Sequence, residues 1–210
     1  ILEPSKWVYA GRPHPERQEV AHLVPLLEKK ANPIERDRGA LGLKSPAMLI
    51  INEDSREVSI FDMQSGQMVS SLLVKDRPEG IAVSPDGRTL YLTIRYSDYL
   101  YALDTNTGEL VAKAETGSYP RAIAVHPNGR IVYVANFNDA TVSALKMPEG
   151  EVIATIKVGN QPVDLVISPG DEKLYCLNMF LGTLSTVDTG RHVSISTLKV
   201  GTSPRALTIG

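Results

Sequence analysis

The stretch PRAIAVHPNGRIVYVAN at residues 120–136 decides the fold, because closely related stretches occur twice more in the chain. Residues 78–94 read PEGIAVSPDGRTLYLTI, and residues 162–178 read PVDLVISPGDEKLYCLN. Each copy begins 42 residues after the one before it. A fixed step of this size is the signature of a repeat protein, in which every copy forms the same structural unit.

Single positions keep the same step. They are Pro78, Pro120, Pro162 and Pro204; Pro85, Pro127 and Pro169; Tyr91, Tyr133 and Tyr175; Asn52, Asn136 and Asn178; and Asp62, Asp104 and Asp188. Each unit contains four short runs rich in Val, Ile, Thr and Tyr, separated by turn-forming residues. We therefore predict an all-β fold, a β-propeller of four-stranded antiparallel blades. One blade cannot bury both faces of its sheet, so the blades must stack around an axis.

Structural roles account for the repeated residues. The proline before each first strand fixes the crossing from one blade's outer edge to the centre of the next. Gly87 and Gly129 supply the permissive dihedral angles of the hairpin turn that follows. The aspartates at 62, 104 and 188 end the third strand, where a carboxylate accepts backbone amide hydrogen bonds in an Asx turn.

We place four blades at about residues 38–79, 80–121, 122–163 and 164–205, with residues 206–210 as the start of a fifth. Residues 1–37 form a non-repeat segment before them. Within it, PERQEVAHLVPLLEKK at 15–30 has apolar residues near helical spacing, which predicts a partly helical segment.

Two possibilities remain for the number of blades in the full ring. In the first, KWVYAG at residues 6–11 supplies a closing strand for a ring of five blades. In the second, which we favour because residues 12–37 fit a blade badly, the chain is part of a larger ring. An open stack would expose strand edges and apolar faces, and a partner would have to cover them. The chain starts with Ile1, so we expect a removed leader or a piece of a longer chain.

The runs IVYVANFNDATVSAL at 131–145 and VIATIKVGNQP at 152–162 closely resemble the YVTN-type β-propeller repeat, and LYCLN at 174–178 is similar. The resemblance covers roughly residues 38–210. It implies a periplasmic, extracellular or cell-surface location and, in this family, usually seven blades. Related propellers include lactonases, the haem-binding domain of nitrite reductases and quinone-dependent amine dehydrogenases.

Composition excludes several classes of function. The 210 residues are 42% hydrophobic and 22% charged, with a net charge of −2. Such a chain has no strong positive electrostatic field that would attract nucleic acid. No apolar run is long enough for a transmembrane helix. The single cysteine, Cys176, falls within a second strand and is expected to be buried.

Function in propellers is expected in the loops, because the blades hold the loops in place. Two loop sets should share one end: those from an outer strand to the next inner strand, and those between the second and third strands. The candidate residues for binding a ligand or partner are Arg77, Arg95, Tyr96, Tyr119, Arg121, Phe137, Phe180 and Arg205. A ring of arginines could grip a small anionic ligand. Alternatively the residues form a solvated rim, partly neutralised by nearby carboxylates.

No catalytic or metal-ligating residues stand out. The four histidines, His14, His22, His126 and His192, have no metal-binding spacing. His126 and His192 fall in turns. Of the four, His14 and His22 would be the better haem ligands, because they lie in the non-repeat segment. The cofactor is unknown, and without a CxxCH motif any covalent haem belongs to another chain.

Three functions fit these observations. The favoured one is a non-catalytic binding or scaffolding module that uses rim and channel loops to bind a partner protein or anionic ligand in a larger assembly. The second is a propeller subunit or domain of a redox protein with haem or quinone. The third is a lactonase-type hydrolase with rim carboxylates around a metal.

Overall fold

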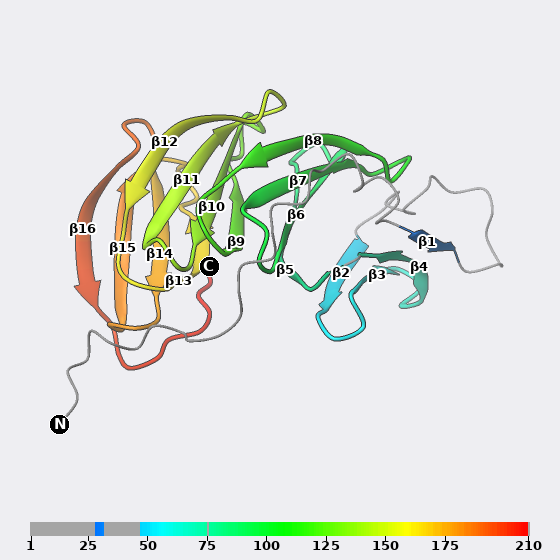
Figure 1. Ribbon diagram of the computed structural model, residues 1–210, viewed down its shortest axis with the longest axis horizontal. Coiled ribbons are helices and arrows are strands. Elements are labelled where there is room, and N and C mark those ends of the chain that lie inside the picture. Colours follow the sequence, from blue (N-terminus) through cyan, green and yellow to red (C-terminus); the bar gives the residue numbers. More distant parts are fainter. Residues whose placement is uncertain (1–27, 32–46, 75, 210) are drawn as a thin grey trace.

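A computed structural model describes residues 28–31, 47–74 and 76–209. They form four antiparallel sheets of four strands each, arranged as a fan in which neighbouring sheets face one another (Figure 1). This confirms the predicted all-β propeller architecture. No helix long and apolar enough to cross a membrane occurs within the described ranges.

The second, third and fourth sheets take their strands in chain order from the inside of the fan outward. Their strands are β5 (Pro78–Val83), β6 (Thr89–Ile94), β7 (Tyr99–Asp104) and β8 (Leu110–Glu115); β9 (Pro120–Val125), β10 (Ile131–Asn136), β11 (Thr141–Lys146) and β12 (Glu151–Lys157); and β13 (Pro162–Ile167), β14 (Lys173–Asn178), β15 (Thr183–Asp188) and β16 (Val193–Lys199). Each of these sheets begins at a repeated proline. Proline is tolerated as the first residue of a strand, because no inter-strand hydrogen bond needs an N–H group at that position.

The first sheet has the order β1-β4-β3-β2, made by β2 (Ala47–Asn52), β3 (Glu57–Asp62), β4 (Met68–Leu73) and β1 (Glu28–Ala31). Strand β1 pairs with the outer edge of β4, so residues 28–30 lie in a strand rather than in the predicted helix. An unpaired edge of β4 offers backbone hydrogen bonds that a helix could not use. Residues 15–27 and the possible closing strand at 6–11 lie outside the described residues.

The inner strands lie side by side, with β5 next to β9 and β9 next to β13. After β16 the chain runs back towards these inner strands (Figure 1). There the backbone N–H of Leu207 donates to Oδ2 of Asp164 in β13, at 2.8 Å. Residues 204–209 form no strand. The contact places them beside β13, where the start of a next blade is predicted.

The core lies between the sheets, and both faces of each second strand contribute to it. In β10, Val132 and Val134 pack towards the second sheet, whereas Tyr133 and Ala135 pack towards the fourth. All four side chains are completely buried. Such a strand is covered on both faces, which explains its unbroken apolar run. Cys176 is buried as predicted, and its burial raises the pKa of the thiol.

The turns follow the predicted chemistry. Oδ1 of Asp104 accepts the backbone N–H groups of Asn106 and Thr107, at 2.7 and 2.8 Å, and this lowers the pKa of the carboxyl. Asp62 and Asp188 accept equivalent backbone bonds. His126 lies in a turn, where its Nδ1 accepts the N–H of Asn128.

The repeated asparagine ties the second strand to the third. Asn178 is completely buried, and its Nδ2 donates to Oγ1 of Thr183 at 3.1 Å and to Oγ of Ser185 at 2.9 Å. Asn136 makes the same two bonds in the third sheet. Gly159, in the preceding crossing loop, packs directly on Asn178, because an added Cβ would lie 2.6 Å from its Cγ. The asparagine therefore has a structural role.

We expect Asn178→Ala to lower the free energy of unfolding by about 2 kcal/mol, because the buried hydroxyl of Ser185 and the part-buried hydroxyl of Thr183 lose their donor. For a domain of this size the melting temperature should fall by roughly 5 °C, measured by thermal denaturation. Asn106→Ala is the control, because Asn106 is exposed and uses its backbone N–H, which alanine retains. Equal melting temperatures for the two variants would contradict the assignment.

Candidate functional site

The two predicted loop sets do meet at one end of the sheets. Backbone hydrogen bonds join them in three successive places: Arg95 N–H to Arg77 C=O at 2.8 Å, Phe137 N–H to Tyr119 C=O at 3.0 Å, and Met179 N–H to Gln161 C=O at 2.9 Å. The bonds recur because all three places are copies of one repeat. They hold each crossing loop against the β-hairpin loop of the next blade, so the side chains of both loops share one rim.

Six of the eight predicted side chains gather on this rim. We call them, together with three carboxylates, the rim cluster: Glu53, Asp54, Arg77, Glu79, Arg95, Tyr96, Tyr119, Arg121 and Phe137. The other two, Phe180 and Arg205, are exposed and take part in none of the cluster's ion pairs or ring contacts. Phe180 is in the loop between β14 and β15, and Arg205 follows β16.

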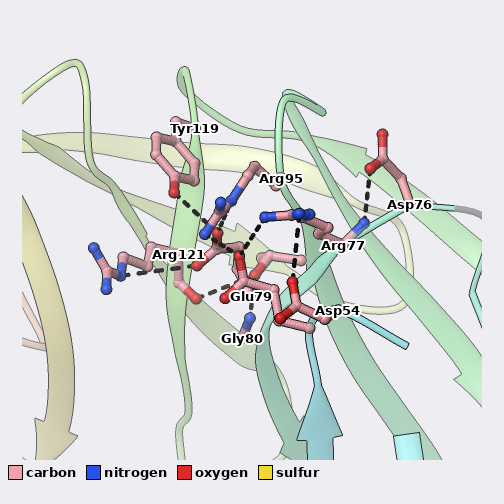
Figure 2. A network of polar contacts seen from close by, with 10 residues as sticks. Asp54, Asp76, Arg77, Glu79, Gly80, Arg95, Tyr119 and Arg121 are labelled. Atoms are coloured by element: carbon pink, nitrogen blue, oxygen red, sulfur yellow. Dashed lines mark hydrogen bonds and ion pairs between the residues drawn. The ribbon is translucent and has the colours of Figure 1, made fainter. Parts of the chain in front are cut away.

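Glu79 is the centre of the cluster (Figure 2). It is the second residue of β5, and its side chain is only 6% exposed. Oε1 accepts a hydrogen bond from Nε of Arg95 and another from the hydroxyl of Tyr119 at 2.9 Å. Oε2 lies 3.9 Å from Nε of Arg121. One buried carboxylate thus links side chains of the second and third blades.

A second layer of ion pairs lies above this centre. Arg95 also pairs through Nη2 with Glu53. Arg77 lies 3.4 Å from Oε1 of Glu53 and 3.4 Å from Oδ1 of Asp54, which is almost fully exposed. Figure 2 shows the guanidinium groups of Arg77 and Arg95 directed towards carboxylates of the network. Three guanidinium groups face three carboxylates, so the cluster is formally neutral.

Two interpretations were predicted for these arginines, a ring that grips an anion and a rim that is partly neutralised by carboxylates. Arg77 and Arg95 form ion pairs with carboxylates of the same cluster. The cost of taking a charge out of water is offset only by such partners. Binding of a small anion at this rim stays a prediction. Arg121 is the arginine with the longest ion pair in the cluster, at 3.9 Å.

A row of aromatic rings borders the charged centre. Tyr96 and Tyr119 stack with ring centroids 5.9 Å apart, and Tyr119 contacts Phe137 at 5.2 Å. The guanidinium groups of Arg95 and Arg121 lie over Tyr119 and Phe137, at 5.8 and 5.3 Å. Tyr96 is 61% exposed, whereas Tyr119 is half-buried. One exposed ring thus lies on a row whose deeper members are fixed.

Burial and pairing shift the ionisation of the central groups. Burial, together with the hydrogen bond to Glu79 and its charge, raises the pKa of Tyr119 to about 12. Burial opposes the charge of Arg95, but its hydrogen bond to Glu79 and the charges of Glu79 and Glu53 raise its pKa overall. At neutral pH the tyrosine is therefore a hydrogen-bond donor and the arginine a fixed cation.

The backbone at Tyr119 is left-handed, with φ of 55°, although it precedes a proline. A non-glycine residue rarely adopts this conformation, and a residue before proline prefers extended backbone. Gln161 and Ser203, one and two repeats later, have φ of 56° and 49°. The left-handed residue therefore recurs in three successive crossing loops, although Arg77 at the same position of the first one does not share it. In this loop it places the Tyr119 ring on the rim.

Sequence reasoning missed the central role of Glu79. The signal was available in the repeat, because the position after the inner-strand proline holds Glu79, Arg121, Val163 and Arg205 in successive copies. An acidic residue in the first copy and a basic one in the second face each other where the inner strands adjoin. Within the described residues, no group of three or more His, Cys, Asp or Glu side chains is placed to hold a metal ion. His14 and His22 lie outside those residues.

The stacked four-stranded sheets and their loop rim define the class of this protein, a β-propeller. The sequence profile of the family described as "Lactonase, 7-bladed beta-propeller" matches residues 44–151, which is just over half of the chain. The chain belongs to this family. No curated protein matches it in sequence.

Two solved structures show the same architecture. The chain is similar to hydrazine synthase of Kuenenia stuttgartiensis, with 28% identity and a TM-score of 0.59 over 61% of this chain and 37% of that one. It is also similar to a functionally unknown protein from Desulfotomaculum acetoxidans DSM 771, with 11% identity and a TM-score of 0.64 over 74% and 53%. The second likeness concerns the fold alone. The chain spans only 37% of the length of the first protein and about half of the second.

Proposed function

We propose that this chain is a non-catalytic propeller module that binds a partner protein through the rim cluster, within a larger assembly outside the cytoplasm. The observation that supports this most is the exposed Tyr96 ring stacked on the fixed Tyr119 ring. Aromatic and arginine side chains dominate the binding energy of protein interfaces, especially where they are surrounded by other contacts.

The ion pairs beneath the rings suit such a role. Tyr119 is held by Glu79 at 2.9 Å and by Arg95 at 5.8 Å from its ring, so its orientation is set before a partner arrives. A preorganised side chain loses less conformational entropy on binding. Because Arg77 and Arg95 already have ion-pair partners, we assign to them the role of positioning the rim cluster. Recognition is assigned to Tyr96 and to the edges of Tyr119 and Phe137.

The location and the finer family assignment belong to the same proposal. The resemblance of residues 131–145 to the YVTN-type repeat suggests a periplasmic or cell-surface module. Fractionation of the source cells, followed by detection of the chain with an antibody, tests the location. Finding the chain in the cytoplasmic fraction would remove this part of the proposal.

We expect Tyr96→Ala to weaken partner binding at least about tenfold, because it removes a large exposed ring from the centre of the contact. The tagged chain is used to capture its partner from native periplasmic and membrane fractions, and the affinity of the purified pair is then measured for both chains. Phe180→Ala is the matched control, since Phe180 is equally exposed at 66% and lies outside the cluster. Equal loss in both variants, or loss in the control alone, would contradict a site at the rim cluster.

A second candidate is a propeller module of a redox assembly, and the 28% identity with hydrazine synthase favours it. In that case a haem or quinone would be supplied by another chain of the assembly. The test is a visible absorption spectrum of the native complex captured with the tagged chain. A Soret or quinone band that copurifies with the chain supports this candidate, and its absence from a complete complex counts against it.

The family name suggests a third candidate, a lactone hydrolase. Glu79 is the buried carboxylate of the rim, but it is engaged by Arg95 and Tyr119. Hydrolysis of simple lactones by the purified chain, measured with and without a chelator, tests it. Activity that chelation abolishes would favour this candidate over a binding module.

A further inference from the structure

Arg121 differs from the other two arginines of the rim cluster in its partners. Its Nε lies 3.9 Å from Oε2 of Glu79, which is too far for a hydrogen bond. Within the described ranges its guanidinium group forms no hydrogen bond and no other ion pair, whereas Arg77 and Arg95 each form hydrogen bonds and several ion pairs. Figure 2 shows a single contact from this guanidinium group, the one to Glu79. The two Nη groups of Arg121 therefore keep all their N–H donors available.

The carboxylates on either side of Arg121 are engaged elsewhere. On the β5 side, the Oε1 atom of Glu79 accepts its hydrogen bonds from two other side chains. On the β13 side, the copy of Arg121 one repeat later is Val163, which is apolar and 7% exposed. The next residue, Asp164, accepts backbone N–H groups with both of its oxygens, at 2.9 and 2.8 Å. In the described part of the chain, no second carboxylate lies within ion-pair distance of Arg121.

The guanidinium group of Arg121 is oriented by its surroundings and is still reached by solvent. Its Cζ lies 5.3 Å from the centre of the Phe137 ring, a cation–π contact. The Arg121 side chain is 28% exposed. In Figure 2 its Nη atoms lie on the side away from Glu79. An anion can therefore approach these two groups without displacing Glu79.

We propose that Arg121 binds a carboxylate that an Asp or Glu side chain of the partner protein presents to the rim cluster. The inference rests on the proposed function, because it names the chemical group of the partner that meets the rim. The Nη1 and Nη2 groups donate parallel hydrogen bonds to the two carboxylate oxygens, a geometry that a planar guanidinium group favours. A carboxylate fits this position better than a phosphate dianion, because nearby Glu79 repels a double charge more strongly.

Acetate is the probe for the site itself, because it carries a carboxylate and little else. It replaces chloride at constant ionic strength in a solution of the full chain, and NMR spectroscopy follows the Nε–H signals of the arginines. We expect the Arg121 signal, assigned by its loss in Arg121→Lys, to shift to saturation with a Kd on the order of 10 mM. The control is Arg205, an exposed arginine at the same repeat position two copies later, whose signal should show no saturation.

The second measurement uses the partner protein captured with the tagged chain. Arg121→Gln should weaken its binding at least about tenfold, because the partner's carboxylate is left without a compensating charge in the contact. Arg121→Lys keeps the charge but not the planar fork, so it should restore only part of the affinity. Arg205→Gln is the matched control and should change the affinity less than about twofold. Circular dichroism verifies that each variant is folded.

Either of two results would overturn the inference. The first is no saturable shift of the Arg121 signal up to 100 mM acetate, which is about ten times the expected Kd. The second is unchanged partner affinity in Arg121→Gln, and this holds even if acetate binds, because the site would then take a free carboxylate. Tyr96→Ala separates this failure from a failure of the proposed function. If Tyr96→Ala still weakens binding, only the carboxylate contact is refuted, whereas unchanged affinity in both variants refutes the rim cluster as the binding site.

Discussion

Replacing Glu79 by glutamine is expected to lower the free energy of unfolding by about 2–3 kcal/mol, because removing one partner of a buried ion pair leaves the other charge without compensation. The melting temperature should then fall by roughly 5–10 °C. The carboxylate is only 6% exposed and accepts bonds from Arg95 and from the Tyr119 hydroxyl. Glutamine has the same shape but no charge. If its carbonyl oxygen faces these donors, Arg95 loses its compensating charge. If its NH₂ group faces them, donors meet a donor.

The control for this variant is Asp54→Asn. Asp54 also pairs with an arginine, Arg77 at 3.4 Å, but its side chain is 93% exposed. Ion pairs at the surface contribute about 0–1 kcal/mol, so the control should melt within about 2 °C of the unchanged chain. If the two variants have the same melting temperature, Glu79 is not the centre of the network.

The same variant has an optical readout at high pH. The pKa of Tyr119 is raised to about 12, first by burial and then by Glu79. Its unfolded pKa is about 10. Stability from this tyrosine is therefore complete below pH 10 and is lost as the pH rises towards 12. In Glu79→Gln the Tyr119 pKa should fall but stay above 10, because burial remains, and tyrosinate absorbance follows it.

Replacing Gly80 by alanine should be strongly damaging. An added Cβ would lie 2.1 Å from the carbonyl oxygen of Arg121 and 2.7 Å from Oγ1 of Thr93. The first of these is backbone of the neighbouring inner strand, so β9 would have to move away from β5. Overpacking of this kind costs about 3 kcal/mol, or a fall of roughly 10 °C in melting temperature.

The change would also break a bridge between the two blades. The N–H of Gly80 donates to Oγ1 of Thr93 at 2.9 Å, and that hydroxyl donates to the carbonyl of Arg121 at 3.1 Å. Gly170→Ala is the control, because nothing lies within 4 Å of its added Cβ, and its stability should be unchanged or slightly raised. A Gly80→Ala chain as stable as this control would mean that the two inner strands can separate without loss.

The repeats predicted the blades well, because turn residues and apolar alternation act locally within each unit. Pro78, Pro120 and Pro162 each open an inner strand, and Asp104 closes a third strand with the expected Asx turn. The helix predicted for residues 15–30 was wrong at 28–30, where pairing with β4 outweighs the helical spacing. Local spacing cannot anticipate a partner strand about forty residues away.

The candidate site was predicted in part. Arg77, Arg95, Tyr119 and Arg121 were chosen because their loops should share an end, and they do meet there. Partial neutralisation by nearby carboxylates was predicted, but the individual pairs and the central position of Glu79 were not. Glu79 comes from β5 and Arg121 from β9, and their approach depends on how closely two inner strands pack.

The amino-acid sequence alone determined that this protein is built from repeated four-stranded sheets with their loops at two ends. Period, turn residues and strand propensity are present in each copy, and similar copies fold alike. Only the tertiary structure decided that Glu79 joins two blades and that Gly80 must lack a side chain where Ala122 and Asp164 have one. These features arise where different copies face each other, and their energies depend on contacts between residues that no single repeat contains.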